Sequence, residues 1–312
     1  MRGLVLGLDS GGTKTVAAVV DNSGTVVALV NGAGLDPTVG DGWKQLLADL
    51  VTPLGEVDAA VLGLPFHGEM PAVTERQSAV AIDLLGPQTA VLNDVAVAFE
   101  GALAGQDGVL ILAGTGSMAW ARGPNGSTRS GGWGDAFGDE GSAYWIGREA
   151  LALVSMYLDG RKSCKAFADD LLAALGIGPD ELITWAYCDN ARVKIASVAR
   201  HVSALAHPDA QAVMQHAAAH LTALGKAAAR TSGATASLRW SYAGGVFNDL
   251  PLLQAVTVQM GSAPIPPRLP PVGGAVLAAA RNVQWPIDAA FIHRLNTTLT
   301  TQISSQLSKE AP

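Results

Sequence analysis

One strand-and-turn arrangement occurs twice in the chain and constrains the fold more than any other feature. In each copy an apolar strand, a glycine turn rich in hydroxyl side chains, a second strand and an Asn-containing glycine turn follow one another. The first copy occupies residues 4–24, and the second, roughly a hundred residues later, occupies residues 109–126. Such a repeat predicts two similar lobes, each with a glycine hairpin.

The residues after the first copy alternate between strand-like and helix-like patterns. A third strand is expected at 26–30. Helix patterns follow at 41–50, 72–85 and 94–103, and they alternate with strand patterns at 59–64 and 90–92. This order, β-β-β-α-β-α-β-α, predicts an α/β lobe that begins with an antiparallel meander. Residues 141–232 are mostly helical in pattern, so we expect the second lobe to repeat this order with helical insertions.

The patterns also predict where the lobes begin and end. We expect an N-terminal lobe at 1–112 and a C-terminal lobe at 113–285. A terminal helix at 286–312 is expected to pack back on the N-terminal lobe.

The charge balance and the cysteine content exclude several classes of protein. Lys and Arg number 20 against 27 Asp and Glu, a net charge of −7, and no dense basic cluster occurs, so nucleic acid is not expected as a partner. The apolar runs are shorter than the roughly 20 residues that span a bilayer, so no membrane helix is expected. Two cysteines outside any CxxC motif, Cys164 and Cys188, predict a reducing compartment. Because Asp9 interrupts the N-terminal apolar run too early for a signal peptide, we expect a cytoplasmic protein.

The turn of the first copy is suited to binding an anion. In the run Asp9–Thr15, Gly11 and Gly12 allow backbone N–H groups to approach a phosphate, while Thr13 and Lys14 add donors. The run lacks the GxxxxGK[ST] pattern, and no helix pattern directly follows its glycines, so a Walker loop and a Rossmann turn are both disfavoured. A tight turn without a ligand is the alternative interpretation of this loop.

Two further glycine turns strengthen the phosphate interpretation. Gly114–Ser117 forms the turn of the second copy, and Gly244-Gly245 lies where a strand pattern meets a helix pattern late in the chain. Three glycine turns at corresponding strand ends predict one bound nucleotide.

The most specific motif lies between the second and third glycine turns. Gly131-Gly132-Trp133-Gly134 is followed by Gly138–Gly147, which contains Asp139 and Glu140. This motif and the loops resemble the N-acetylglucosamine kinases of the BadF/BadG/BcrA/BcrD ATPase family, within the actin/sugar-kinase/Hsp70 superfamily, over nearly the whole chain. The resemblance implies a two-lobed actin-like ATPase (ribonuclease H-like) fold, ATP and Mg²⁺ as cofactors, an amino sugar substrate and a homodimer.

The resemblance also implies which residues contact the nucleotide. They are Gly11, Gly12, Thr13, Lys14, Gly114, Thr115, Gly116, Ser117, Ala196, Gly244 and Gly245. Asp9, at the end of the first strand, would hold Mg²⁺ through water. The alternative interpretation is that Asp9 only starts a turn.

Asp94 is the expected catalytic base. The resembled family places its catalytic carboxylate at the start of the helix after the last strand of the first lobe, which is the position of Asn93-Asp94 here. A carboxylate at a helix N-terminus stays ionised and can accept the hydroxyl proton of a sugar during phosphoryl transfer. This implies a kinase that transfers the γ-phosphoryl group of ATP to the 6-hydroxyl of N-acetylglucosamine or glucosamine. The alternative interpretation is that Asp94 only caps the helix.

The remaining sugar contacts follow from the same resemblance. They are Asp36, Gly132, Trp133, Gly134 and Asp139, together with Asp94. A core position is the alternative for Trp133, and Glu140 is expected to be structural.

Two segments depart from the family pattern. Asp36 stands where relatives often have Asn, and an ionised carboxylate accepts hydrogen bonds but cannot donate them. Because a carboxylate suits the ammonium of glucosamine, the choice between glucosamine and its N-acetyl form is open. Pro65–Glu69 replaces a small Ser/Ala-Gly turn and predicts a reshaped roof of the sugar pocket, with His67 as an additional candidate ligand.

Two other functions are open at this point. An ATPase that activates a radical dehydratase would need cysteine thiolates, here Cys164 or Cys188, to bind an iron–sulfur cluster across a dimer. A catalytically silent sugar or nucleotide sensor would keep the fold without turnover. A zinc-dependent ROK sugar kinase is not expected, because two distant cysteines cannot complete its zinc site.

Overall fold

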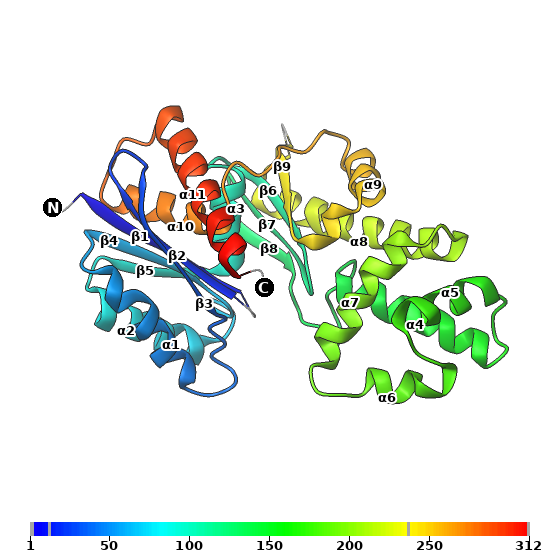
Figure 1. Ribbon diagram of the computed structural model, residues 1–312. Coiled ribbons are helices and arrows are strands. Elements are labelled where there is room, and N and C mark those ends of the chain that lie inside the picture. Colours follow the sequence, from blue (N-terminus) through cyan, green and yellow to red (C-terminus); the bar gives the residue numbers. More distant parts are fainter. Residues whose placement is uncertain (1–2, 12–13, 236–237, 311–312) are drawn as a thin grey trace. The chain divides into compact units, whose positions relative to one another are not determined.

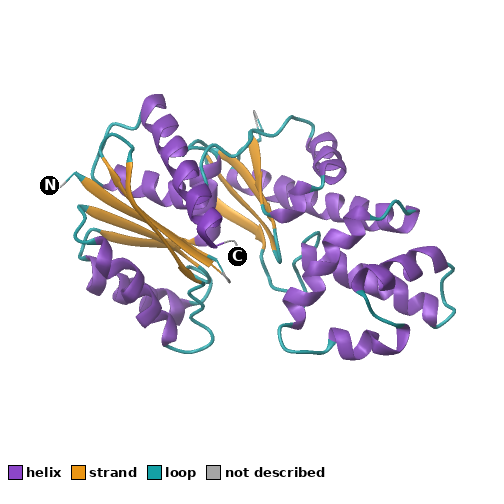
Figure 2. Cartoon of the chain, in the orientation of Figure 1, coloured by secondary structure: helices purple, strands orange, loops and turns teal. Residues whose placement is uncertain are grey.

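The chain folds into two compact α/β units (Figure 1, Figure 2). The computed structural model describes residues 3–11, 14–235 and 238–310. Unit 1 contains the residues up to Gln106 and those from Pro266 onward, and unit 2 contains Asp107–Ile265. Each unit has its own mixed sheet, which confirms the expected two-lobed α/β architecture.

The sheet of unit 1 brings the ends of three strands to one edge. Its strand order is β3-β2-β1-β4-β5. The strands are β1 (Leu4–Ser10), β2 (Lys14–Asp21), β3 (Val26–Ala33), β4 (Ala59–Leu64) and β5 (Thr89–Asn93). The first three form the predicted antiparallel meander, while β1, β4 and β5 run parallel. Asp9 pairs with Gly63 and Asn93 pairs with Leu64, so parallel pairing places Asp9 and the residue after Asn93 at the same edge.

Helices cover both faces of this sheet. They are α1 (Gly42–Val51), the 3₁₀ turn η1 (Thr52–Leu54), α2 (Pro71–Leu85), α3 (Asp94–Ala102), α10 (Pro271–Asn282) and α11 (Ala289–Glu310). On one face, Leu6 and Leu8 join a core with Trp43 and Leu47 of α1. On the other face, Val5 joins a core with residues of α3, α10 and α11. Successive residues of β1 therefore enter opposite cores, as the alternation of a strand requires.

The position of α10 corrects the predicted boundaries of the lobes. The segment 266–285 was expected in the C-terminal lobe but belongs to unit 1. Small residues explain this, because a Cβ on Gly7 would lie 2.5 Å from the backbone nitrogen of Val276, and one on Gly274 would lie 2.0 Å from the carbonyl oxygen of Val97. Only glycines allow α10 to approach β1 and α3 this closely.

The C-terminal helix α11 also packs on unit 1. Gln302 donates a hydrogen bond through Nε2 to the carbonyl oxygen of Val26 at 2.9 Å, and Gln306 donates to that of Leu29 at 2.8 Å. These side chains therefore bind the backbone of β3.

Unit 2 repeats the meander on a smaller sheet with the strand order β8-β7-β6-β9. The strands are β6 (Gly108–Ala113), β7 (Ser117–Gly123), β8 (Gly126–Gly131) and β9 (Trp240–Ala243). The helices are α4 (Ala143–Leu158), α5 (Lys165–Leu175), α6 (Leu182–Ala186), α7 (Ala191–Ala204), α8 (Pro208–Ser232) and α9 (Leu250–Met260), with 3₁₀ turns η2 (Pro179–Glu181) and η3 (Gly245–Asn248). The expected order required five strands, whereas the described residues of unit 2 form four, because the chain returns to unit 1 after α9.

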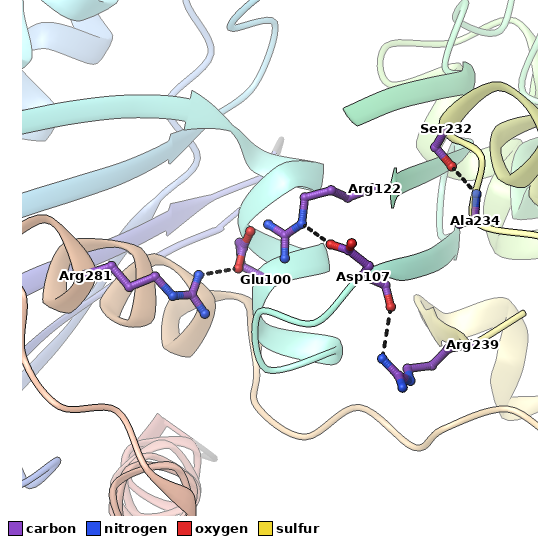
Figure 3. A network of polar contacts seen from close by, with 7 residues as sticks. All are labelled: Glu100, Asp107, Arg122, Ser232, Ala234, Arg239 and Arg281. Carbon is purple, nitrogen blue, oxygen red and sulfur yellow. Dashed lines mark hydrogen bonds and ion pairs between the residues drawn. The ribbon is translucent and has the colours of Figure 1, made fainter. Parts of the chain in front are cut away.

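Each unit contains an ion pair close to the place where the chain passes from one unit to the other (Figure 3). In unit 1, Arg281 of α10 donates to Oε2 of the nearly buried Glu100 at 2.7 Å. In unit 2, Arg122 donates through Nε to Oδ1 of Asp107 at 2.9 Å.

Within the described part of the chain, no helix is long and apolar enough to cross a membrane.

Candidate active site

The base of the first glycine hairpin is fixed by buried hydroxyl groups. Thr15 Oγ1 donates to the carbonyl oxygen of Ala33 at 2.6 Å, so the 2.8 Å hydrogen bond between Thr15 and the buried Ser10 must be donated by Ser10. Ser10 Oγ in turn accepts from the N–H of Leu35 at 3.0 Å. The predicted phosphate ligands Gly12 and Thr13 lie outside the described residues, and Lys14 is exposed at the start of β2.

Asp9 lies at the end of β1, and its carboxyl group has an unusual pKa. Burial, and then the charge of Asp94, raise the pKa of Asp9 to about 7. The described residues contain no group of three or more His, Cys, Asp or Glu side chains that could hold a metal ion by itself. A magnesium ion at Asp9 would therefore take most of its oxygen ligands from phosphates and water, which is how Mg²⁺ is commonly bound.

Asp94 is the first residue of α3, and the helix is capped by its neighbour Asn93. The N–H of Val95 donates to Asn93 Oδ1 at 3.0 Å and to Asp94 Oδ1 at 2.9 Å. Burial, opposed by the hydrogen bond from the Val95 N–H and assisted by the charge of Glu69, raises the pKa of Asp94 to about 6. Asp94 is thus not the N-cap, and it is a carboxyl group that titrates close to neutral pH.

The segment Pro65–Glu69 is tied to the start of α3 through Asn93. The Nδ2 group of Asn93 donates to the carbonyl oxygen of His67 at 3.1 Å and to Oε1 of Glu69 at 3.0 Å. The ring of His67 shares a 3.1 Å hydrogen bond with Gln77, which is 1% exposed and also donates to the carbonyl oxygen of Pro65 at 2.9 Å. Burial lowers the pKa of His67.

Sequence reasoning named His67 but missed Asn93, Glu69 and Gln77 as parts of this network. An Asn between a strand pattern and a helix pattern is a typical N-cap, and this signal could have identified Asn93. Gln77 has no comparable signal, because a helical sequence pattern does not indicate that this side chain will bind the preceding loop.

Asp36 is held in a local turn. Its Oδ1 accepts from the N–H of Thr38 at 2.8 Å and from the Thr38 hydroxyl at 2.6 Å. This is an Asx turn, which fixes the direction of the carboxylate.

The second glycine hairpin rests on the motif between Asp139 and Ser142. The N–H of Ser117 donates to Asp139 Oδ1 at 3.2 Å, and its hydroxyl donates to the carbonyl oxygen of Glu140 at 2.8 Å. A Cβ on Gly116 would lie 2.9 Å from a carboxylate oxygen of Asp139, so this carboxylate lies directly against the loop. The side chain of Thr115, by contrast, is exposed and available to a ligand.

Asp139 was expected to contact the sugar, and its surroundings are those of a buried structural acid. The residue is 3% exposed and has a φ of 58°. Its Oδ2 accepts from Nη2 of Arg192 at 2.7 Å. A carboxylate has about four acceptor sites, so Asp139 has acceptor sites left for a sugar hydroxyl besides those used by Ser117 and Arg192. That contact stays a prediction.

Trp133 lies on the surface of unit 2. It is 62% exposed, so the alternative of a core position is wrong. The guanidinium of Arg129 lies 4.9 Å from the ring centroid, a cation–π contact. The flanking Gly132 and Gly134 have φ values of 72° and 83°, which explains why glycines stand on both sides of this ring.

A cavity of about 370 Å³ in unit 2 contains two of the predicted adenosine contacts. Ala196 of α7 and Gly245 both line it, together with Ala143 at the start of α4 and Arg200. The preceding Gly244 has a φ of 97°, and a Cβ there would lie 2.2 Å from the carbonyl oxygen of Ala113. This third glycine turn therefore contacts the end of β6, where the second phosphate loop begins.

The two cysteines lie in different surroundings within unit 2. Cys164 is buried in the hydrophobic core, and burial raises the pKa of its thiol. Cys188 is exposed. Cys164 is thus poorly suited to act as a thiolate ligand.

The two units, each opening with the same glycine hairpin, define a two-lobed fold of the actin-like ATPase class, which is also found in solved sugar kinases. The chain belongs to the BadF/BadG/BcrA/BcrD ATPase family, whose model matches residues 6–279. This confirms the family expected from the sequence.

Solved structures with this fold include candidate and established sugar kinases. A candidate N-acetylglucosamine kinase from Chromobacterium violaceum is 25% identical, with a TM-score of 0.68 and coverage of 88% of this chain and 98% of that one. A ROK family glucokinase from Streptomyces griseus, solved with glucose and AMPPNP, is 19% identical, with a TM-score of 0.59 and coverage of 90% and 100%.

Two curated relatives are similar in sequence. The N-acetylmuramic acid/N-acetylglucosamine kinase of Clostridium acetobutylicum is 28% identical over 217 residues, which is 64% of this chain and 69% of that protein. The N-acetyl-D-glucosamine kinase of Dictyostelium discoideum is 30% identical over 206 residues, 59% of this chain and 64% of that protein. The second alignment thus spans slightly less than two thirds of the relative.

Proposed function

We propose that this protein is an ATP-dependent hexosamine kinase that transfers the γ-phosphoryl group of ATP to the 6-hydroxyl of N-acetylglucosamine or glucosamine. The observation that carries this proposal is the carboxyl group of Asp94, which starts α3 beside the cap residue Asn93 and has its pKa raised to about 6. Both curated relatives are named as N-acetylglucosamine kinases, which supports an amino sugar as the acceptor.

Asp94 would act as the general base. As the 6-oxygen of the sugar attacks the γ-phosphorus, its proton moves to a carboxylate oxygen of Asp94, and the bond between the γ-phosphorus and the bridging oxygen of ADP breaks. A base with a pKa of about 6 is mostly ionised at neutral pH, yet it binds a proton more strongly than an ordinary Asp. We therefore expect transfer to slow below about pH 6.

ATP would contact residues of both units. In unit 1, Gly11 and Lys14 would contact the phosphates, and Asp9 would hold Mg²⁺ through water. Gly12 and Thr13, which lie outside the described residues, would also contact the phosphates. Unit 2 would supply the loop Gly114–Ser117, together with the adenosine contacts Ala196, Gly244 and Gly245. Bound Mg²⁺ would neutralise the charge that develops on the phosphates during transfer. The low exposure of Asp9, which disfavours its ionised form, fits a position that is completed by a cation.

The sugar would contact Asp36 and Asp94 in unit 1, and Gly132, Trp133, Gly134 and Asp139 in unit 2. The exposed ring of Trp133 is available to pack on an apolar face of a sugar ring. The fixed direction of the Asp36 carboxylate favours recognition of a donor, such as the ammonium of glucosamine or a hydroxyl group. We further expect a cytoplasmic homodimer.

An activator ATPase with an iron–sulfur cluster is the weaker candidate, because of the two cysteines Cys164 is buried in the core of unit 2 and Cys188 alone is exposed. A silent sensor would bind its ligand without turnover, and the position of Asp94 at the start of α3, with a pKa of about 6, favours the kinase over it.

The identity of the product tests the proposal. The protein is incubated with Mg-ATP and, separately, glucosamine, N-acetylglucosamine, N-acetylmuramic acid or glucose, and the product is analysed by ³¹P NMR. We expect a 6-phosphate of one of the first two sugars. A phosphate at another position, or on none of the four sugars, would contradict the proposal.

A further inference from the structure

A buried acid lies directly behind the second glycine loop. The carboxylate of Asp139 accepts from the N–H of Ser117, and a Cβ on Gly116 would lie 2.9 and 3.0 Å from its two oxygens. The same loop is the proposed contact for the phosphates of ATP. A negative charge in this position would repel the nucleotide, and it would do so strongly because buried charges are poorly screened by water and salt.

Arg192 provides the opposite charge. Its Nη2 donates to Asp139 Oδ2 at 2.7 Å, and its Nε lies 3.5 Å from Oδ1 of Asp135 in the same loop. The ion pair with Asp139 is therefore close and charge-assisted, and it joins α7 to the loop that carries Trp133.

The helix that carries Arg192 has a fixed position in unit 2. A Cβ on Gly147 of α4 would lie 2.0 Å from the carbonyl oxygen of Ile195, so α4 and α7 are in backbone contact. Ala196, one turn after Arg192, lines the cavity of the proposed adenosine site. The start of α7 thus faces the phosphate loop, and the following turn faces the cavity.

We propose that Arg192 is a positioning residue for nucleotide binding, which neutralises Asp139 so that the loop Gly114–Ser117 can accept the phosphates of ATP. Arg192 acts through Asp139 and does not contact the nucleotide. This inference rests on the ATP site of the proposed function, and it adds a requirement that the family resemblance did not supply.

A double-mutant cycle separates this role from a direct contact with phosphate. The Asp139 side chain is buried, whereas that of Arg192 is 45% exposed. Removal of Arg192 would leave a buried charge uncompensated, whereas neutral replacement of both partners is often tolerated. Mg-ADP binding is measured by titration calorimetry for the wild type, Arg192→Gln, Asp139→Asn and the double variant. We expect the Kd to rise roughly 5- to 50-fold in Arg192→Gln and to return to within about two-fold of wild type in the double variant.

Two results would overturn the inference. One is a Kd for Arg192→Gln that equals the wild-type value. The other is a double variant that binds as weakly as Arg192→Gln, because this would mean that the guanidinium itself contacts the nucleotide. If Arg192→Gln does not fold, Arg192→Lys, which keeps the positive charge, is measured instead. It should bind Mg-ADP within about five-fold of wild type, and a larger loss would contradict a role in charge neutralisation.

The control is Arg161→Gln, which removes the same charge from an exposed ion pair with Asp159 in unit 2. It should leave the Kd unchanged, since exposed pairs contribute little. Failure of the wild type to bind Mg-ADP would instead remove the nucleotide site of the proposed function. Because binding needs no sugar and no turnover, this outcome is distinct from failure of the Arg192 inference alone.

Discussion

The two units share one strand-and-turn arrangement, but the acidic side chains beside it have opposite surroundings. In unit 1, burial raises the pKa of both Asp9 and Asp94, and the charge of Asp94 raises that of Asp9 further. In unit 2, the buried acid is Asp139, and it receives hydrogen bonds from Ser117 and a charge-assisted one from Arg192. The first pair is held in a state that favours binding a proton or a cation, whereas the second acid is already neutralised.

This difference assigns different tasks to the two repeats. An acid that gains a proton readily near neutral pH suits general base catalysis, and a neighbouring acid suits a metal that would relieve the repulsion between them. An acid paired with arginine suits a structural position next to an anion. Both hairpins are proposed to contact phosphates, and we propose that the acids beside them differ in role: those of unit 1 serve proton transfer and metal binding, whereas Asp139 of unit 2 supports its phosphate loop.

Substitution of the base should have the largest effect. We expect Asp94→Asn to lower turnover by roughly 10²–10⁴-fold with little change in nucleotide affinity, because the amide cannot accept the hydroxyl proton. Steady-state kinetics and Mg-ADP titration measure both quantities. Asp83→Asn, at an exposed position on α2, is the matched control and should retain wild-type turnover. Normal turnover of Asp94→Asn would remove Asp94 from the mechanism.

Substitution of the two adjacent glycines in the third glycine turn should lower the free energy of unfolding by different amounts. In Gly244→Ala, the new Cβ meets the carbonyl oxygen of Ala113 at a positive φ, so we expect a loss of about 2–4 kcal/mol in the free energy of unfolding. In Gly245→Ala the Cβ enters open space, and the loss should be below about 1 kcal/mol. Urea denaturation of both variants tests this pair. Equal losses would mean that the close approach of Gly244 to β6 is not a constraint.

The dependence of stability on pH should reveal the acids of unit 1. Because the pKa of Asp9 is about 7 in the folded protein and 3.8 as its ordinary value, the folded state binds the proton more tightly. Stability from this group is therefore full below about pH 4 and is lost as the pH rises through 7. We expect Asp9→Asn to lose less stability than the wild type between pH 5 and pH 8 without Mg²⁺, as measured by urea midpoints. An identical loss in both proteins would contradict the raised pKa.

The smallest effect is expected at Asp36. In Asp36→Asn the side-chain oxygen can keep both hydrogen bonds from Thr38, while the new amide group can donate. The ratio of kcat/KM for N-acetylglucosamine to that for glucosamine should therefore rise, by roughly ten-fold or less. An unchanged ratio would exclude Asp36 from the choice between the two sugars.

Local patterns were sufficient to predict much of unit 1. The order of its first eight strands and α-helices follows from the alternation of apolar residues and from turn residues, both of which are readable within short windows. Local patterns placed Asp94 between a strand and a helix, whereas its role as the base was inferred from the family resemblance and stays a prediction. The glycine turns at 114–117 and 244–245 were also visible as local patterns.

The features that sequence patterns missed depend on contacts between distant segments. The assignment of α10 to unit 1 rests on the approach of Gly274 to α3, which lies more than a hundred residues earlier. Arg192 is an ordinary helical arginine until the fold brings it to Asp139. Gln77 lies ten residues after His67, and it becomes part of the site only through hydrogen bonds to the Pro65–Glu69 loop that its helical pattern does not indicate.

The most direct test of the account is ADP release from Mg-ATP by the wild-type protein, measured with glucosamine, with N-acetylglucosamine, with glucose and with no sugar. The account predicts that an amino sugar stimulates ADP release well above the rate without sugar, because Asp94 accepts a proton from the sugar hydroxyl. Equal ADP release with and without sugar, or none under any condition, would contradict it.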